Sequence, residues 1–136
     1  MQEESVKAFK KDLGTYRYKL GRKKDLEDKI QECYDRLGGV RAVDPSREPT
    51  HSMPNIDVEY ALRDRISELE RKLRHVCDQI EEIEQILDRI DSPLKTAVLE
   101  VYANGYTIRS QAERMFLSET GLRKRINKAI EKALID

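Results

Sequence analysis

A heptad repeat of apolar residues runs through the middle of the chain. Its members recur at alternating steps of four and three: Leu62, Ile66, Leu69, Leu73, Val76, Ile80, Ile83, Leu87 and Ile90. The residues between them are mostly charged, as in SELERK and DQIEEIEQ. A pattern of this kind, kept over about four repeats, is typical of a helix that packs along a narrow apolar seam. We predict one long helix, capped by Asn55 or Asp57 and ended by the break before Pro93.

A weaker helical pattern precedes it, from Glu4 to Leu37. The apolar positions fall into two groups, Leu13, Tyr16 and Leu20, then Leu26, Ile30, Cys33 and Leu37. The phase slips between the groups, so we predict a stutter or kink near Gly21. Gly38 and Gly39 are expected to end the helix, and the proline-containing segment 39–56 is expected to be a loop.

These two helices predict an antiparallel coiled-coil hairpin over residues 1–91. Each has an apolar face too narrow to form a core alone. We therefore expect the hairpin to pair with a second copy of itself as a homodimer, or to contact another protein.

Residues 92–136 have a different pattern, with wider apolar faces on shorter segments. Asn104-Gly105 and Leu117-Ser118 divide the region, and Thr107 and Ser118 are suitable helix caps. The apolar positions of the three segments are Leu94, Ala97, Val98, Val101 and Tyr102; Ile108, Ala112 and Met115; and Leu122, Ile126, Ala129, Ile130 and Ala133. We predict a separate trihelical domain, so the whole chain is expected to be all-α.

The spacing within this region favours a helix-turn-helix. A small residue, Ala112, stands where two helices would cross, and Met115, Leu117 and Leu122 follow three, five and ten residues later. In this motif the second helix enters the major groove of DNA with its N-terminal part. The last helix is therefore the predicted recognition helix.

The segment VLEVYANGYTIRSQAERMFLSETGLRKRINKAIEKAL resembles region 4 of bacterial sigma factors. The matching residues are Val98, Leu99, Tyr102, Gly105, Thr107, Ala112, Ser118, Leu122 and Ala133-Leu134. Two residues depart from the pattern: Gln111 replaces the preferred Ile, and Phe116 replaces the usual turn glycine. The whole chain also resembles small phage-encoded regulators of Gram-positive bacteria, of the ArpU and RinA kind. This second resemblance implies sequence-specific DNA binding and activation of phage late or packaging genes.

Charge gives a local indication of DNA contact, although the formal net charge of the chain is zero. Basic residues crowd the last helix, whereas the acidic stretch 81–91 should repel DNA. The predicted base contacts are Glu119, Thr120, Arg123, Lys124 and Asn127. The predicted phosphate contacts are Arg109, Ser118, Arg125 and Lys128. Arg and Asn side chains can read guanine and adenine through paired hydrogen bonds.

Other chemistries have little support in the sequence. It contains no phosphate-binding glycine loop, no paired histidines and no nucleophile–base set, so we expect neither an enzyme nor a bound metal or cofactor. The polar first residues and the absence of a long apolar run predict a cytoplasmic protein of a bacterial host. Two alternatives stay open: a protein-interaction adaptor that binds RNA polymerase or a host factor through the hairpin, and a polymerase specificity subunit.

Overall fold

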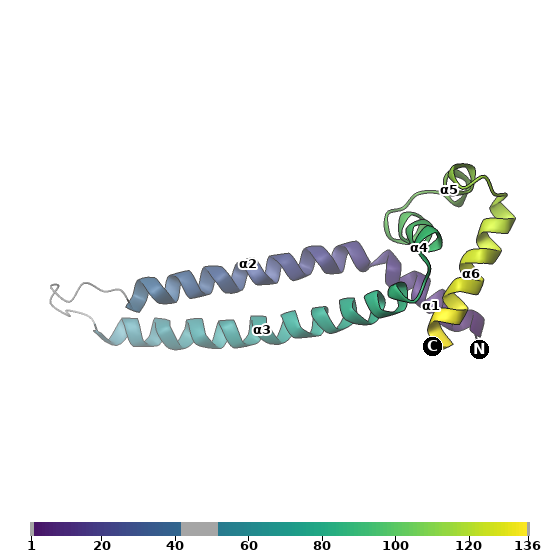
Figure 1. Ribbon diagram of the computed structural model, residues 1–136. Coiled ribbons are helices and arrows are strands. Elements are labelled where there is room, and N and C mark those ends of the chain that lie inside the picture. The colour runs from purple at the N-terminus through teal and green to yellow at the C-terminus, as the bar shows by residue number, and fades with distance from the viewer. Residues whose placement is uncertain (1, 42–51, 136) are drawn as a thin grey trace. The chain divides into compact units, whose positions relative to one another are not determined.

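The structure, a computed structural model, describes residues 2–41 and 52–135. Every regular element within these ranges is helical, which confirms the predicted all-α class for this part of the chain. The elements, shown in Figure 1, are α1 (Gln2–Gly14), α2 (Tyr16–Arg41), α3 (Ser52–Asp88), α4 (Ser92–Val98), the π-helix η1 (Leu99–Ala103), α5 (Ile108–Arg114) and α6 (Glu119–Ile135).

The chain divides into two compact units. Unit 1 comprises Met1–Leu20 and Asp78–Asp136, and unit 2 comprises Gly21–Cys77. Helices α2 and α3 therefore contribute residues to both. This grouping differs from the predicted boundary at residues 91 and 92, because α1 and the end of α3 pack with the C-terminal helices.

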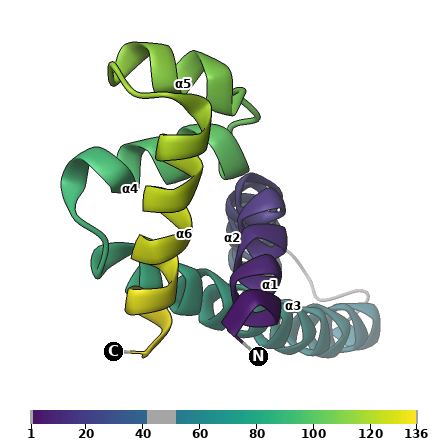
Figure 2. The ribbon, with the colours of Figure 1, turned by 90° about the vertical axis from the view of Figure 1, so that its right-hand side faces the viewer.

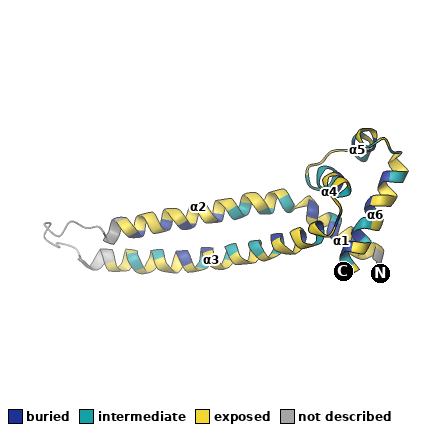
Figure 3. Ribbon diagram, viewed as in Figure 1, coloured by how far each residue is buried: buried dark blue, intermediate teal, exposed yellow. Residues whose placement is uncertain are grey.

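Unit 2 is built from α2 and α3, which lie side by side and run in opposite directions (Figure 1). Its core lies between them and consists of Leu26, Ile30, Cys33, Leu37, Ile66 and Leu69, with Leu62, Leu73 and Val76 half-buried against it. The remaining faces of the two helices are exposed (Figure 3). The Tyr34 hydroxyl donates a hydrogen bond to Glu70 Oε1 at 3.1 Å, and this bond raises the pKa of Tyr34. A narrow apolar seam thus holds the pair, as the heptad repeat predicted.

Unit 1 is organised around α6. Its buried core draws on every helical segment of the unit except η1 and the start of α2: Val6, Phe9, Leu13, Ile83, Leu87, Ile90, Ala97, Val98, Ala112, Leu122, Ile126, Ile130 and Ala133. Figure 2 shows α1 beside the C-terminal half of α6, and α1 contacts both α6 and η1. The N-terminal helix is therefore part of the C-terminal core, which the sequence analysis did not predict.

An arginine at the end of α3 closes the last turn of α6. Arg89 Nη1 donates to the backbone oxygen of Ala133 at 2.8 Å. The last carbonyls of a helix lack partners within the helix, and they carry a partial negative charge. A guanidinium at this position both satisfies one carbonyl and complements that charge.

The helix is unbroken at Gly21, where a stutter or kink was predicted, and its one interruption within residues 2–41 lies at Thr15, between α1 and α2. The backbone nitrogen and Oγ1 of Thr15 both bond to the Asp12 carbonyl, at 3.1 and 2.9 Å. Local bonds of this kind compete with the regular helical ladder. Gly21 lies inside α2 with open space around it.

Two predicted helix ends are also wrong. Helix α2 continues through Gly38 and Gly39 to Arg41, and α3 begins at Ser52, before the expected caps Asn55 and Asp57. Pro54 falls in the first turn of α3, where its missing N–H has no helical partner to lose. Residues 42–51 of the predicted loop lie outside the described residues.

Burial of α1 in unit 1 gives a stability prediction. Leu13 is fully buried, and truncation of a buried leucine leaves a cavity. We expect Leu13→Ala to lower the free energy of unfolding by about 2–5 kcal/mol, measured by urea denaturation. The matched control is Leu20→Ala, at a position 39% exposed, which should cost about 1 kcal/mol or less. Equal losses for the two variants would contradict the placement of α1 in the core.

Candidate nucleic-acid interface

Thr107 caps the start of α5, as predicted. Thr107 has an extended backbone, and its Oγ1 accepts a hydrogen bond from the Ser110 N–H at 3.1 Å. This bond satisfies one of the free N–H groups at the start of the helix. Gly105 supplies the positive φ of 81° that the preceding connection requires.

The connection between α5 and α6 is a Schellman turn. The Leu117 N–H bonds to the Ala112 carbonyl at 2.9 Å, and the Phe116 N–H bonds to the Glu113 carbonyl at 3.3 Å. This pair of bonds requires a left-handed residue at the position that glycine usually occupies. Phe116 takes that conformation, with φ of 57°, and its ring is 95% exposed. The aromatic residue therefore adopts the strained glycine geometry without burying its ring among the described residues.

Helix α6 starts immediately after this turn with its own cap. Ser118 Oγ accepts the Gly121 N–H at 3.0 Å, and the Ser118 carbonyl accepts the Leu122 N–H at 2.9 Å. Leu122, Ile126 and Ile130 are fully buried, and Ala112 of α5 is 2% exposed in the same core. A small side chain at that place lets α5 and α6 approach closely.

The opposite face of α6 is cationic. Arg123, Lys124, Arg125, Lys128 and Lys132 are all exposed, against the carboxylates of Glu119 and Glu131. None of these five cations forms an ion pair within residues 2–41 and 52–135. Their charges are available to an anionic partner.

Most residues of the predicted interface lie on this accessible surface. Glu119, Thr120, Arg123 and Lys124 are exposed at the N-terminal half of α6. The predicted phosphate contacts Arg109, Ser118, Arg125 and Lys128 are exposed as well, although Arg109 lies 3.7 Å from Glu113 in an exposed ion pair.

Asn127 differs from the other predicted contacts. It is half-buried on the side of α6 next to α1, and its Oδ1 accepts a hydrogen bond from Lys10 Nζ. Lys10 also lies 5.0 Å from the centre of the Tyr102 ring, so it links α1 to both α6 and η1. Part of the Asn127 amide is thus engaged within unit 1.

The sequence analysis counted Lys132 among the basic residues of the last helix but assigned no contact role to it, and it overlooked Lys10. Lys124, Lys128 and Lys132 are four residues apart, a spacing that places them on one helix face. This spacing could have identified Lys132. Nothing in the local pattern of α1 indicates that Lys10 reaches α6, since that contact depends on tertiary packing.

Gln111 is the polar residue of the core. It is 4% exposed, and its Nε2 has no hydrogen-bond partner among the described residues. This is the position where the sigma-like pattern prefers Ile. A buried donor without a partner costs about 1–3 kcal/mol, so Gln111 weakens the packing of α5 on its neighbours.

Metal-ligand clusters and membrane-spanning helices are two other features relevant to function in the described part of the chain. No group of three or more His, Cys, Asp or Glu side chains is arranged to hold a metal ion there. None of the helices in those ranges has the combined length and apolar character needed to cross a bilayer.

No protein-family model, curated protein or solved structure matches this chain. Any function assigned to the α5–α6 surface must therefore rest on its geometry and charge.

The left-handed turn gives a second prediction. Phe116→Gly should raise the free energy of unfolding by about 1 kcal/mol, because glycine adopts positive φ without the Cβ strain. Phe116→Ala is the matched control, since it removes the exposed ring but keeps the Cβ. Chemical denaturation would measure both. Equal stabilisation by Ala and Gly would show that backbone strain is not the cause.

The orphaned amide gives a third prediction. Gln111→Met keeps the length of the side chain and removes the unsatisfied donor. We expect it to raise the free energy of unfolding by about 1 kcal/mol, seen as a higher melting temperature. Gln111→Glu should instead destabilise unit 1, because it buries a carboxyl group without a partner. If Gln111→Met destabilised the protein, the amide would have a partner that the geometry does not reveal.

Proposed function

We propose that this chain is a transcription regulator that binds double-stranded DNA in a sequence-specific manner through α5 and α6. The observation that carries the proposal is the division of α6 into a fully buried apolar face and an exposed face with five unpaired cations. The short Schellman connection to α5 and the close contact at Ala112 are what a helix-turn-helix requires.

In this proposal the N-terminal half of α6 enters the major groove. Arg123 and Lys124 would read base edges, since Arg and Lys donate paired hydrogen bonds to guanine. Ser118 would hold a phosphate at the start of α6, where backbone N–H groups and the helix dipole favour an anion. Arg109, Arg125 and Lys128 would add phosphate contacts, which give affinity without sequence information.

Asn127 is less available for contact with a base than the sequence analysis predicted. Its Oδ1 accepts from Lys10, so a paired contact to adenine would require that bond to break. We therefore assign base reading to Thr120, Arg123 and Lys124, with Glu119 as a candidate acceptor for a cytosine amino group.

The similarity to sigma region 4 and to the phage regulators extends the proposal. We further propose that the protein activates phage late genes and acts in the cytoplasm of a bacterial host. It would form a homodimer through α2 and α3 and would contact RNA polymerase. An adaptor that binds only proteins is the opposing candidate, and the DNA-binding experiment decides between them.

The central test selects a binding site from a pool of random duplexes with the full-length protein. We expect one enriched motif, and we expect Arg123→Ala to weaken binding to it by about 1–3 kcal/mol, as for loss of a base contact. Binding of Arg123→Ala to a scrambled duplex should change much less. Lys132→Ala is the matched control, since it removes a cation from the opposite end of the same helix and should weaken both duplexes alike.

Competition titrations at two salt concentrations complete this test. Specific binding should weaken with salt yet keep its preference for the selected motif. Failure to enrich any motif, with equal binding of selected and scrambled duplexes, would favour the adaptor instead.

A further inference from the structure

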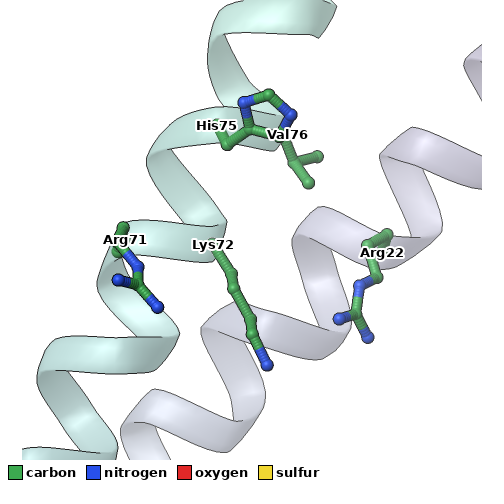
Figure 4. A pocket seen from close by; sticks show the side chains of 5 residues that line it. All are labelled: Arg22, Arg71, Lys72, His75 and Val76. Atoms are coloured by element: carbon green, nitrogen blue, oxygen red, sulfur yellow. The ribbon is translucent and has the colours of Figure 1, made fainter.

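Unit 2 contains a second cationic surface, far from α6 in the sequence. A groove of about 530 Å³ lies between α2 and α3 and is lined by Arg22, Arg71, Lys72, His75 and Val76 (Figure 4). We call these five residues the basic groove. Arg22 comes from α2 and the other four come from α3, so the packing of the two helices assembles the groove.

Further basic residues lie next to the groove residues in the sequence, in two runs that are bounded by Asp25 and Glu70. Lys23, Lys24 and Arg74 flank the groove residues in sequence, and neither run 21–24 nor run 71–77 contains an acidic residue. Beyond residue 77 the charge of α3 changes sign, with Asp78, Glu81 and Glu82. The neutral net charge of the chain thus conceals a local positive field.

One carboxylate inside unit 2, Glu68, neutralises part of this charge and leaves the two arginines of the groove unpaired among the described residues. Glu68 pairs with Lys72 at 3.1 Å and with Arg65 at 3.7 Å. The hydrogen bond from Lys72 and its charge lower the pKa of Glu68, and Arg65 and Arg71 contribute to the same shift. Neither Arg22 nor Arg71 forms an ion pair among the described residues.

An anion would relieve the repulsion between these cations. The core between α2 and α3 brings them together, since Leu73 and Val76 of α3 pack against the buried cluster that includes Leu26 of α2. Guanidinium groups present a planar set of donors that matches the oxygens of a phosphate. The groove is open to solvent, so its cations are accessible to a continuous anionic chain as well as to a single ion.

We infer that the basic groove is a second nucleic-acid contact, which binds the phosphodiester backbone of a duplex without reading its sequence. This inference rests on the proposed function only for the identity of the partner. The groove adds affinity, whereas α6 supplies the preference for a motif.

The test compares two double variants of the full-length chain. Arg22→Gln/Arg71→Gln removes the two unpaired guanidiniums of the groove. Arg36→Gln/Arg63→Gln is the matched control, because it removes the same charge from the same two helices at residues paired with Glu32 and Glu59. All four arginine positions are on the helix surface or half-exposed, and unchanged thermal melting would confirm that both variants are folded.

Fluorescence anisotropy would measure binding to a scrambled 30-base-pair duplex between about 50 and 200 mM salt. We expect the groove variant to bind about tenfold more weakly than the control variant, with a salt dependence smaller by about one to two counterions. Equal affinities and equal salt slopes for the two double variants would overturn the inference.

A third variant, Lys124→Ala/Lys128→Ala, separates this inference from the proposed function. If this third variant lost its preference for the motif while the groove variant bound duplex as tightly as its control, the proposed function would be supported and the inference about the basic groove would be rejected. If only the groove variant lost affinity for duplex and no motif were selected, the inference about the basic groove would be supported and sequence-specific regulation would be rejected. Poly-L-glutamate that competed as strongly as duplex at equal charge would identify a carboxylate-rich protein as the occupant and would also overturn the inference.

Discussion

Burial of one face of α6 is the interaction on which unit 1 depends. Leu122, Ile126 and Ile130 are completely enclosed, and the residues that enclose them come from α1, the end of α3, α4 and α5. Burial of each large aliphatic side chain contributes about 1.5–3 kcal/mol, so these three contacts are a large part of what holds the segments together. Because the apolar face is fully used in packing, the basic residues of the same helix can only face outward.

The distribution of charge follows from the same packing. A coiled pair needs only a narrow seam, which leaves most positions of α2 and α3 free to carry charge. In unit 1 the wider core of α6 leaves one exposed face, and that face carries five cations without carboxylate partners in the part of the chain that the structure describes. In unit 2 the seam places Arg22 of α2 in the same groove as Arg71 and Lys72 of α3. Both surfaces arise where packing brings like charges together and carboxylates among the described residues pair with few of them, Lys72 with Glu68 being an exception. Net charge alone therefore gave no indication of a partner.

Elements with a strong local pattern could be predicted from the sequence, and elements that depend on tertiary contacts could not. The nine heptad positions, eight in α3 and Ile90 just after it, are all buried or half-buried, and Thr107 caps α5 as expected. The break at Thr15 was missed because the slip in the apolar pattern pointed to Gly21. The bonds from Thr15 to the Asp12 carbonyl, which mark the break, have no equally strong signal in the sequence. The place of α1 in unit 1 was missed because Val6 and Phe9 show only that α1 has an apolar face. They do not show which distant helix covers that face.

The two departures from the sigma-like pattern both carry a local cost in the structure. Phe116 holds a left-handed backbone that glycine adopts freely, and Gln111 buries an amide nitrogen without a partner. Both residues flank the crossing of α5 and α6, where Ala112 is packed. Phe116 and Gln111 each raise the free energy of this connection. The packing of the surrounding core must therefore stabilise the connection by more than they destabilise it. The connection is therefore held by the burial of Ala112 and Leu122 on either side of it. The residues of the turn itself do not favour it, and for that reason the spacing of the apolar positions predicted it better than the turn residues did.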